Sequence, residues 1–293
     1  MNTIGTNHSM FDERFVSFDC AGDTCLGVLT MPKSQVTHAD LGVLVIVGGP
    51  QTRVGSHRQF VLLARALAAA GVPAFRFDYR GMGDSAGDAR TFEHIRTDIV
   101  SAIEVLQREA GVDRVVLWGL CDGASAAWMD GADDPRVDGI VAVNPWARSP
   151  QGEATTRLKH YYLQRLLAPE FWRKVISGRS SLRQRAGELA GAVQTAARPV
   201  NAGNAIEYLK RMEDGWGRFT SPILVILSGN DYTAREFEDW VAGSGARKAL
   251  LSRDQCEVVR MPDADHTFSS RVWRDRVSEI TIEWIGEIDG RCR

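Results

Sequence analysis

A cysteine in a glycine-rich turn is the residue whose surroundings most clearly suggest chemistry. Cys121 lies between Gly119 and Gly123, after the apolar run Val115–Trp118 and before an alanine-rich stretch. A strand that passes through Gly-x-Cys-x-Gly into a helix is typical of a nucleophile elbow, with Cys in place of the more usual Ser. The helix N-terminus behind such a turn favours a thiolate and an oxyanion. We therefore expect Cys121 to be a nucleophile rather than a buried structural thiol.

Two later residues stand where an acid and a base are needed. Asp231 follows the apolar run Ile223–Leu227, and His266 follows the strand-like stretch Glu257–Met261. Such positions, just past the ends of parallel strands, are where α/β sheets gather catalytic groups. We expect His266 to take the proton of Cys121 and Asp231 to hold the imidazole tautomer while an acyl-cysteine forms and is then hydrolysed.

The acid has alternatives. Asp231 also fits the first position of a helix, where Asp is a frequent cap. Asp263 and Asp265 lie beside His266, and either would be the acid if Asp231 is only a cap. Their closeness along the chain makes the geometry awkward, so we rank them below Asp231.

An oxyanion hole needs two backbone donors. The N–H of Asp122, directly after the nucleophile, is one candidate. The other is expected in the loop Val47-Gly-Gly-Pro-Gln51, where Pro50 has no N–H and the donor is therefore Gly49 or Gln51. We prefer Gly49, because the glycine pair lets a substrate approach the backbone closely.

The residues that contact the substrate are not marked by a motif, so they are predicted from their positions alone. His57 opens a helix and could reach a substrate anion, although an ordinary surface role at a helix start fits better. Trp146 follows a predicted strand and is well placed to face the site, whereas Tyr161 and Trp172 could line an apolar pocket or form a small core of their own. The stretch Asp78–Ser85 is expected to be a structural turn.

Strands alternate with helices along most of the chain, which predicts a mostly parallel sheet flanked by helices, an α/β fold. Expected strands are Phe15–Phe18, Cys25–Thr30, Gly42–Gly49, Ala74–Tyr79, Val115–Trp118, Gly139–Val143, Ile223–Leu227 and Glu257–Met261. Expected helices are Arg58–Ala70, Phe92–Ala110, Cys121–Asp130, Leu158–Leu167, Ala205–Met212, Ala234–Ala242 and Ser270–Ile288. This alternation of strands and helices is interrupted between residues 147 and 218. We expect residues 1–146 and 219–293 to form the core and residues 147–218 to form a helical cap.

Composition excludes several classes of protein. The 293 residues carry a formal net charge of −2, which argues against a broad surface for nucleic acid. No apolar run approaches the length of a membrane span, and the first residues do not resemble a signal peptide, so we expect a cytoplasmic protein. The five cysteines include no CxxC pair, and no cluster has metal-ligand spacing, so neither disulfide, metal nor cofactor is expected.

The motifs resemble those of a known superfamily. Gly-x-Cys-x-Gly, the late Asp and the later His are similar to the α/β-hydrolases, with a cysteine nucleophile as in dienelactone hydrolases. FDYRGMGDS and VGGP resemble two further segments of that superfamily, the second being its oxyanion loop with Val47 in place of a histidine. More narrowly, the stretch from GGPQTRVGSHRQF to FDYRGMGDS, with WGLCDGASA, looks like the exosortase A system-associated hydrolase 1 family. That resemblance implies a bacterial hydrolase, but it names no substrate.

Three functions compete at this point. The leading hypothesis is a hydrolase of carboxylic esters or thioesters. An acyltransferase would use the same acyl-cysteine in a site that excludes water. A non-catalytic binding module is disfavoured because Cys121, Asp231 and His266 are all present. The partner is expected to be a small-molecule ester or thioester, and the sequence leaves the oligomeric state open.

Overall fold

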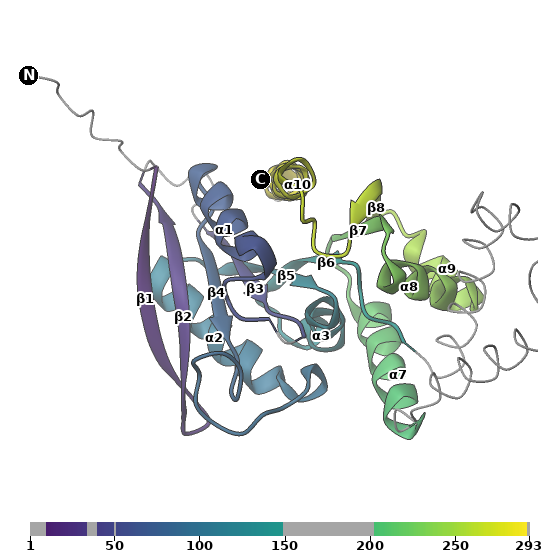
Figure 1. The fold of residues 1–293 in the computed structure, drawn as a ribbon, viewed down its shortest axis with the longest axis horizontal. Helices are drawn as coiled ribbons and strands as arrows, with labels where there is room; N and C mark the ends of the chain where they lie inside the picture. The colour runs from purple at the N-terminus through teal and green to yellow at the C-terminus, as the bar shows by residue number, and fades with distance from the viewer. Residues whose placement is uncertain (1–9, 34–39, 50, 149–201, 292–293) are drawn as a thin grey trace, which may run out of the picture.

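A computed structural model describes residues 10–33, 40–49, 51–148 and 202–291. Eight strands form one sheet in the order β1-β2-β4-β3-β5-β6-β7-β8 (Figure 1). The strands are β1 Phe11–Cys20, β2 Asp23–Pro32, β3 Leu41–Ile46, β4 Ala74–Asp78, β5 Arg114–Leu120, β6 Val137–Val143, β7 Ile223–Asn230 and β8 Cys256–Asp265. β2 runs antiparallel to its neighbours β1 and β4, and the strands from β4 to β8 run parallel. This confirms the α/β fold with a mostly parallel sheet.

Helices cover both faces of the sheet. They are α1 Gln59–Ala69, α2 Arg96–Ala110, α3 Asp122–Asp130, α7 Ala202–Arg218, α8 Tyr232–Ala242, α9 Gly245–Leu251 and α10 Arg271–Arg291, with short 3₁₀ turns η1 Ser56–Arg58, η2 Phe92–His94 and η3 Gly131–Asp133. α1 and α10 pack on one face, and α2, α3, α7 and α8 pack on the other (Figure 1). β3 is buried along its whole length and β5 along nearly all of it, as their continuous apolar sequences predict.

The segment expected to form the cap is only partly described. Residues 149–201, with the expected helix Leu158–Leu167, lie outside the described residues, so the cap stays a prediction there. Its last part is α7, which packs closely on α3: a Cβ added at Gly215 would lie 2.1 Å from the carbonyl oxygen of Trp128. Trp128 and Trp216 also stack, with ring centroids 4.8 Å apart. This helix therefore belongs to the layer that flanks the sheet.

Some boundaries differ from the sequence prediction. The expected helix Phe92–Ala110 is divided into η2 and α2, because Ile95 between them leaves helical geometry and is buried. β1 and β2 are longer than expected, since they pair with each other along their entire length. α9 has no counterpart in the sequence prediction, because its seven residues are too few to show helical periodicity.

Candidate active site

Cys121 occupies a strained turn between β5 and α3. Its φ of 61° and ψ of −125° are rare for a residue with a side chain, and such strain is found mainly at functional sites. Its N–H donates to the carbonyl oxygen of Val143 at 2.9 Å, which ties the turn to the end of β6. A Cβ at Gly119 would lie 2.4 Å from the carbonyl carbon of Gly123, and a Cβ at Gly123 would lie 2.5 Å from the carbonyl oxygen of Ile46. Glycine is therefore needed at both positions of the predicted turn.

Asp231 and His266 are in direct contact. Asp231 Oδ2 lies 2.7 Å from His266 Nδ1, and the carboxylate also accepts hydrogen bonds from the N–H groups of Thr233 and Ala234 at the start of α8. The Asp231 side chain is 5% exposed and that of His266 31% exposed. The Asp231 carboxylate therefore caps α8 and contacts His266 at the same time, so the two interpretations of this residue do not exclude each other.

The other two acids near His266 have different surroundings. Asp265 accepts bonds from the N–H groups of Thr267 and Ser269 and from the Ser269 hydroxyl, so it closes the turn that carries His266. Asp263 is exposed, and its carbonyl oxygen accepts from the side chain of Asn230. The geometry therefore favours Asp231 as the partner of His266.

A buried network holds the histidine loop, and the sequence prediction missed it. Asn144, fully buried after β6, donates from Nδ2 to the Ser228 hydroxyl at 2.9 Å and to the carbonyl oxygen of His266 at 3.2 Å. The Ser228 hydroxyl donates onward to the carbonyl oxygen of Asp265 at 3.0 Å. Asn144 has a φ of 44°, a conformation that Asn tolerates better than most residues. An Asn directly after a strand and before Pro145 was the available signal.

The loop after β3 lies against the turn at Cys121. A Cβ at Gly48 would lie 2.2 Å from Asp122 Oδ1 and 2.4 Å from the carbonyl oxygen of Leu120, so only glycine fits there. Gly49 has a φ of 61°, and a Cβ there would meet nothing within 4 Å. The Gln51 side chain accepts bonds from the N–H of Ser56 and the amide of Gln59, which gives Gln51 a structural role in its loop.

The electrostatics differ from the expectation of a ready thiolate. Burial raises the pKa of the Cys121 thiol, and the neighbouring Asp122 carboxylate raises it further, while the Asp122 N–H opposes both. Burial also raises the pKa of Asp122 to about 6, although the N–H groups of Gly49, Gly123 and Asp122 itself lower it. Burial therefore outweighs the effect of the helix N-terminus on the pKa of Cys121, which favours the thiol over the thiolate.

Trp146 lies beside Cys121, and its role as a substrate contact stays a prediction. Its N–H donates to the carbonyl oxygen of Cys121 at 3.2 Å, and the Arg148 guanidinium stacks 4.2 Å from the centre of its ring. Arg148 Nε in turn donates to both carboxylate oxygens of Glu236 on α8, at 3.1 and 3.0 Å. Arg148 also lowers the pKa of Cys121 by its charge, so this stacked arginine, which the sequence prediction did not single out, lies within electrostatic reach of the sulfur.

The remaining substrate candidates are less informative. His57 is exposed on η1. Against the effect of burial, hydrogen bonds from Ser269 and Thr267 lower the pKa of Asp265, and the charge of His57 adds a smaller contribution. Tyr161 and Trp172 lie outside the described residues.

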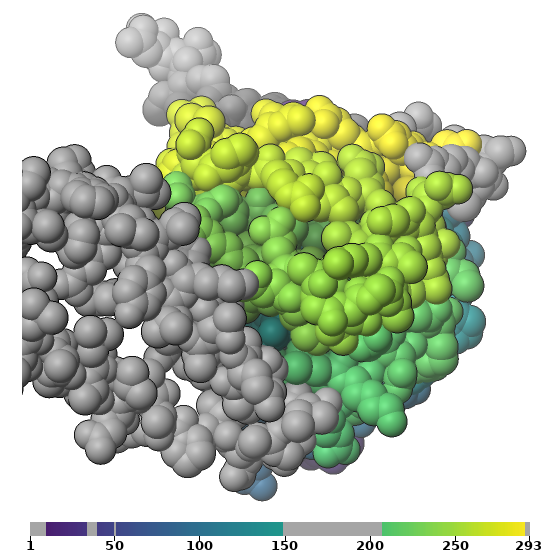
Figure 2. All heavy atoms as spheres, turned by 90° about the vertical axis from the view of Figure 1, so that its right-hand side faces the viewer, coloured from purple at the N-terminus to yellow at the C-terminus, as the bar shows by residue number. Residues whose placement is uncertain are grey.

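Figure 2 shows the side of the molecule where the C-terminal part of the chain, including α8, α9 and β8, forms the surface.

The stretch Asp78–Ser85 is structural, as expected. Buried Asp78 accepts bonds from the N–H groups of Arg53 and Asp84 and pairs with the Arg53 guanidinium. The Arg80 guanidinium donates to both carboxylate oxygens of buried Asp98 at 2.9 and 3.0 Å. These pairs fix the loop after β4.

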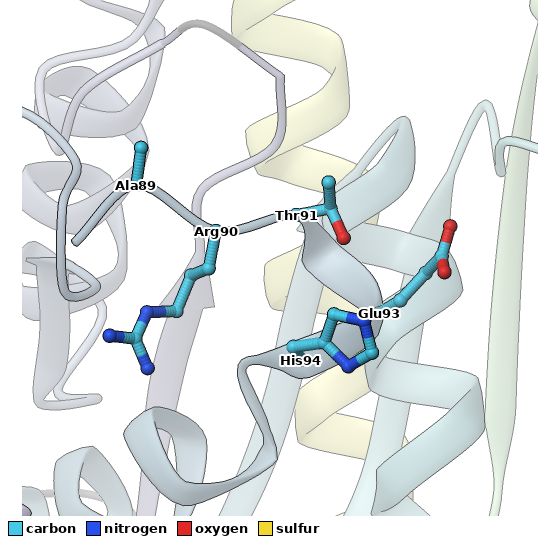
Figure 3. A pocket seen from close by; sticks show the side chains of 5 residues that line it. All are labelled: Ala89, Arg90, Thr91, Glu93 and His94. Atoms are coloured by element: carbon cyan, nitrogen blue, oxygen red, sulfur yellow. The ribbon is translucent and has the colours of Figure 1, made fainter.

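Two further features lie apart from these residues. Cys20, Cys25 and Asp98 bring their ligand atoms within 4.8 Å of one another, a grouping that sequence spacing did not reveal. Because Arg80 already neutralises Asp98, we assign no metal to it. A hollow of about 480 Å³ is lined, among the described residues, by Ala89, Arg90, Thr91, Glu93 and His94 (Figure 3). None of the catalytic candidates is in that lining.

Within the described part of the chain, no helix is both long enough and apolar enough to cross a membrane. Among curated proteins, an uncharacterized 31.7 kDa protein in the traX-finO intergenic region of Escherichia coli is 36% identical over 83 residues, which are 27% of this chain and 29% of that protein. The match therefore covers less than a third of either length.

Solved structures match over nearly the whole chain. Est1E from Butyrivibrio proteoclasticus, solved with ferulic acid, has a TM-score of 0.64 at 19% identity, covering 93% of this chain and 98% of that one. An esterase from Pyrococcus furiosus has a TM-score of 0.63 at 14% identity, covering 94% and 91%. At these identities the likeness shows the fold alone. Residues 43–279, however, match the alpha/beta hydrolase family itself, and the chain belongs to that family.

Proposed function

We propose that the protein is a cysteine-dependent hydrolase of carboxylic esters or thioesters, with Cys121 as nucleophile, His266 as base and Asp231 as acid. The observation that carries the proposal is the 2.7 Å contact between Asp231 and His266, made by residues that follow β7 and β8 in a sheet whose β5 leads into the strained turn at Cys121. The ends of these parallel strands meet at one edge of the sheet, where such folds place their chemistry.

The reaction starts from a neutral thiol. Because burial keeps the proton on Cys121, the sulfur attacks the carbonyl carbon while His266 Nε2 removes the thiol proton. Asp231, at Nδ1, holds the tautomer that leaves Nε2 free to accept, and it stabilises the imidazolium that forms. The N–H groups of Asp122 and Gly49 are the proposed donors to the oxyanion.

The tetrahedral intermediate then collapses. The carbon–oxygen or carbon–sulfur bond of the leaving group breaks, and the His266 imidazolium gives its proton to the departing alcohol or thiol. Water, deprotonated by His266, attacks the acyl-cysteine, and Cys121 leaves with the proton that His266 returns. The acyl group departs as a carboxylic acid.

The structural neighbours support ester substrates as the first to try. Est1E was solved with ferulic acid, an aromatic carboxylic acid, and the Pyrococcus furiosus protein is described as an esterase. Trp146, whose ring carries the Arg148 guanidinium and whose N–H donates to the carbonyl oxygen of Cys121, is the proposed contact for the acyl group. The resemblance to exosortase-associated hydrolases remains part of this proposal and adds no substrate.

The test is a panel of p-nitrophenyl esters of increasing chain length, acyl-CoA thioesters, lactones and feruloyl esters, each assayed with the wild type and with Cys121→Ala. The proposal expects hydrolysis of at least one class by the wild type and none by the variant. Equal hydrolysis by both proteins would remove Cys121 from the mechanism. Adding an amine or alcohol acceptor to the same assay separates a transferase, which would yield the acylated acceptor in place of the free acid.

A further inference from the structure

The side chain of Asp122 occupies an unusual place for an acid in the first turn of a helix. There a carboxylate ordinarily faces solvent and is stabilised by the helix dipole. Here the carboxyl group is buried, and burial raises its pKa although the N–H groups of Gly49, Gly123 and Asp122 itself lower it. The side chain lies against the loop after β3, where Oδ1 is 2.2 Å from the position that a Gly48 Cβ would take.

One carboxylate oxygen is left without a partner. Among the described residues no group donates a hydrogen bond to Asp122 Oδ1, although that atom is buried. A buried acceptor atom without a hydrogen-bond donor costs an ionised carboxylate much more free energy than it costs a protonated carboxyl group. The carbonyl oxygen of Leu120 lies 2.4 Å from the same Gly48 Cβ position, so it borders the same space as Oδ1.

The carboxyl group also faces the proposed oxyanion donors. The N–H groups of Gly49 and of Asp122 itself are directed at it closely enough to lower its pKa, even though none satisfies Oδ1. A carboxylate in this place competes with a substrate oxyanion for the same donors, and two negative charges cannot share a buried site cheaply.

We propose that the Asp122 side chain occupies the oxyanion position of the resting enzyme and yields it to substrate only as the neutral acid, so that ionisation of Asp122 suppresses attack by Cys121. The inference rests on the proposed acyl-cysteine mechanism. The neutral acid binds the two N–H groups more weakly and releases them to the substrate. The ionised carboxylate holds them and disfavours negative charge on the sulfur. Asp122 thus acts on the reaction through Cys121 and the oxyanion donors, as a positioning residue.

Other charges face this group from neighbouring elements. His266, after β8, lowers the pKa of Asp122 by its charge. Tyr79, after β4, has its own pKa raised to about 12 by burial first and then by Asp122. Asp231 and Arg148 act on Cys121 in opposite directions. Burial outweighs these effects on Asp122, whose pKa is about 6, so the proposed change falls at mildly acidic pH.

The test compares the wild type with Asp122→Asn, which keeps the shape but cannot ionise. The first readout is the rate of Cys121 alkylation by iodoacetamide, followed by peptide mass spectrometry. The proposal expects alkylation of Asp122→Asn at about pH 8 to be at least about tenfold faster than that of the wild type, because one unit of thiol pKa changes the thiolate fraction tenfold. The second readout is kcat/KM against pH. In the wild type it should fall above about pH 6, and this fall should be absent from the variant, whose profile then follows the base His266 alone.

Asp122→Ala is the second variant, because it removes the occupant altogether and should likewise lack the fall above about pH 6. If Asp122→Asn and Asp122→Ala lose activity equally at every pH and their alkylation is not accelerated, Asp122 is only a structural acid of α3 and the inference is overturned. If activity survives Cys121→Ala, the proposed function fails instead, and the two failures are told apart by that control. Thermal unfolding of each variant at the assay pH shows that the comparison is made on folded protein.

Discussion

One carboxylate serves both α8 and His266. Asp231 Oδ2 lies 2.7 Å from His266 Nδ1, while the two carboxylate oxygens accept the first free N–H groups of α8 at 3.0 and 3.2 Å. The helix thereby fixes the direction of the acid, and the acid fixes the imidazole. A rigid helix end orients the histidine more firmly than an exposed loop residue would.

Asp231→Asn should separate these two roles. Asparagine caps a helix about as well as aspartate, so the variant should unfold at nearly the wild-type temperature. It cannot hold the same imidazole tautomer or stabilise the imidazolium, and we expect kcat to fall by about four orders of magnitude. Steady-state kinetics and thermal unfolding measure the two effects.

Asp263→Asn is the matched control, because Asp263 is exposed and lies three residues before His266. It should leave kcat unchanged. A nearly silent Asp231→Asn together with a strong loss in Asp263→Asn or Asp265→Asn would move the role of the acid to the histidine loop.

We expect Asn144 to affect both stability and catalysis, although it does not contact the substrate in the proposed mechanism. Asn144→Gly keeps the left-handed backbone but removes the bonds to Ser228 and to the carbonyl oxygen of His266. Leaving such buried groups unpaired costs about 1–3 kcal/mol, so the unfolding free energy should drop by that amount. A displaced His266 should also lower kcat more than it raises KM.

Ser228→Ala offers the comparison for Asn144, since it breaks the same network at a point that does not contact His266 directly. We expect a similar loss of unfolding free energy with a smaller loss of kcat. Unchanged kinetics in Asn144→Gly would show that the network only stabilises the fold.

Gly48→Ala tests the close approach of the loop after β3 to the nucleophile turn. The added methyl carbon would lie 2.2 Å from Asp122 Oδ1 and 2.4 Å from the Leu120 carbonyl oxygen, so the loop must move. We expect a loss of kcat/KM of at least about a hundredfold, the usual result of misplacing a catalytic group by about 1 Å. Gly286→Ala, in α10 where a Cβ meets nothing within 4 Å, should keep full activity.

The sequence could predict what depends on local rules. Gly119 and Gly123 mark the strained turn because a Cβ on either would collide with backbone, and Asp231 and His266 follow apolar runs that had to be strands. Asn144 and Ser228 could not be linked, because their contact joins residues 84 positions apart across the ends of β6 and β7. The raised pKa of Cys121 could not be predicted from the sequence either, because it depends on burial and on the direction of the Asp122 side chain.

Cys121→Ser distinguishes a thiol that is deprotonated during attack from a standing thiolate. Because burial keeps Cys121 protonated, the serine variant can follow the same route with His266 as base, and we expect it to retain partial ester hydrolysis. Comparison of kcat for a p-nitrophenyl ester and for the matching thioester measures this. Complete loss in the serine variant, with wild-type folding, would favour a preformed thiolate.

The most direct measurement is intact-protein mass spectrometry of the enzyme quenched in acid during turnover of an activated ester. We expect a covalent adduct of the acyl mass, mapped by peptide sequencing to Cys121, to accumulate in the wild type and to be absent from Cys121→Ala. An enzyme that turns over the ester without any adduct, or an adduct of the same mass in Cys121→Ala, would contradict it.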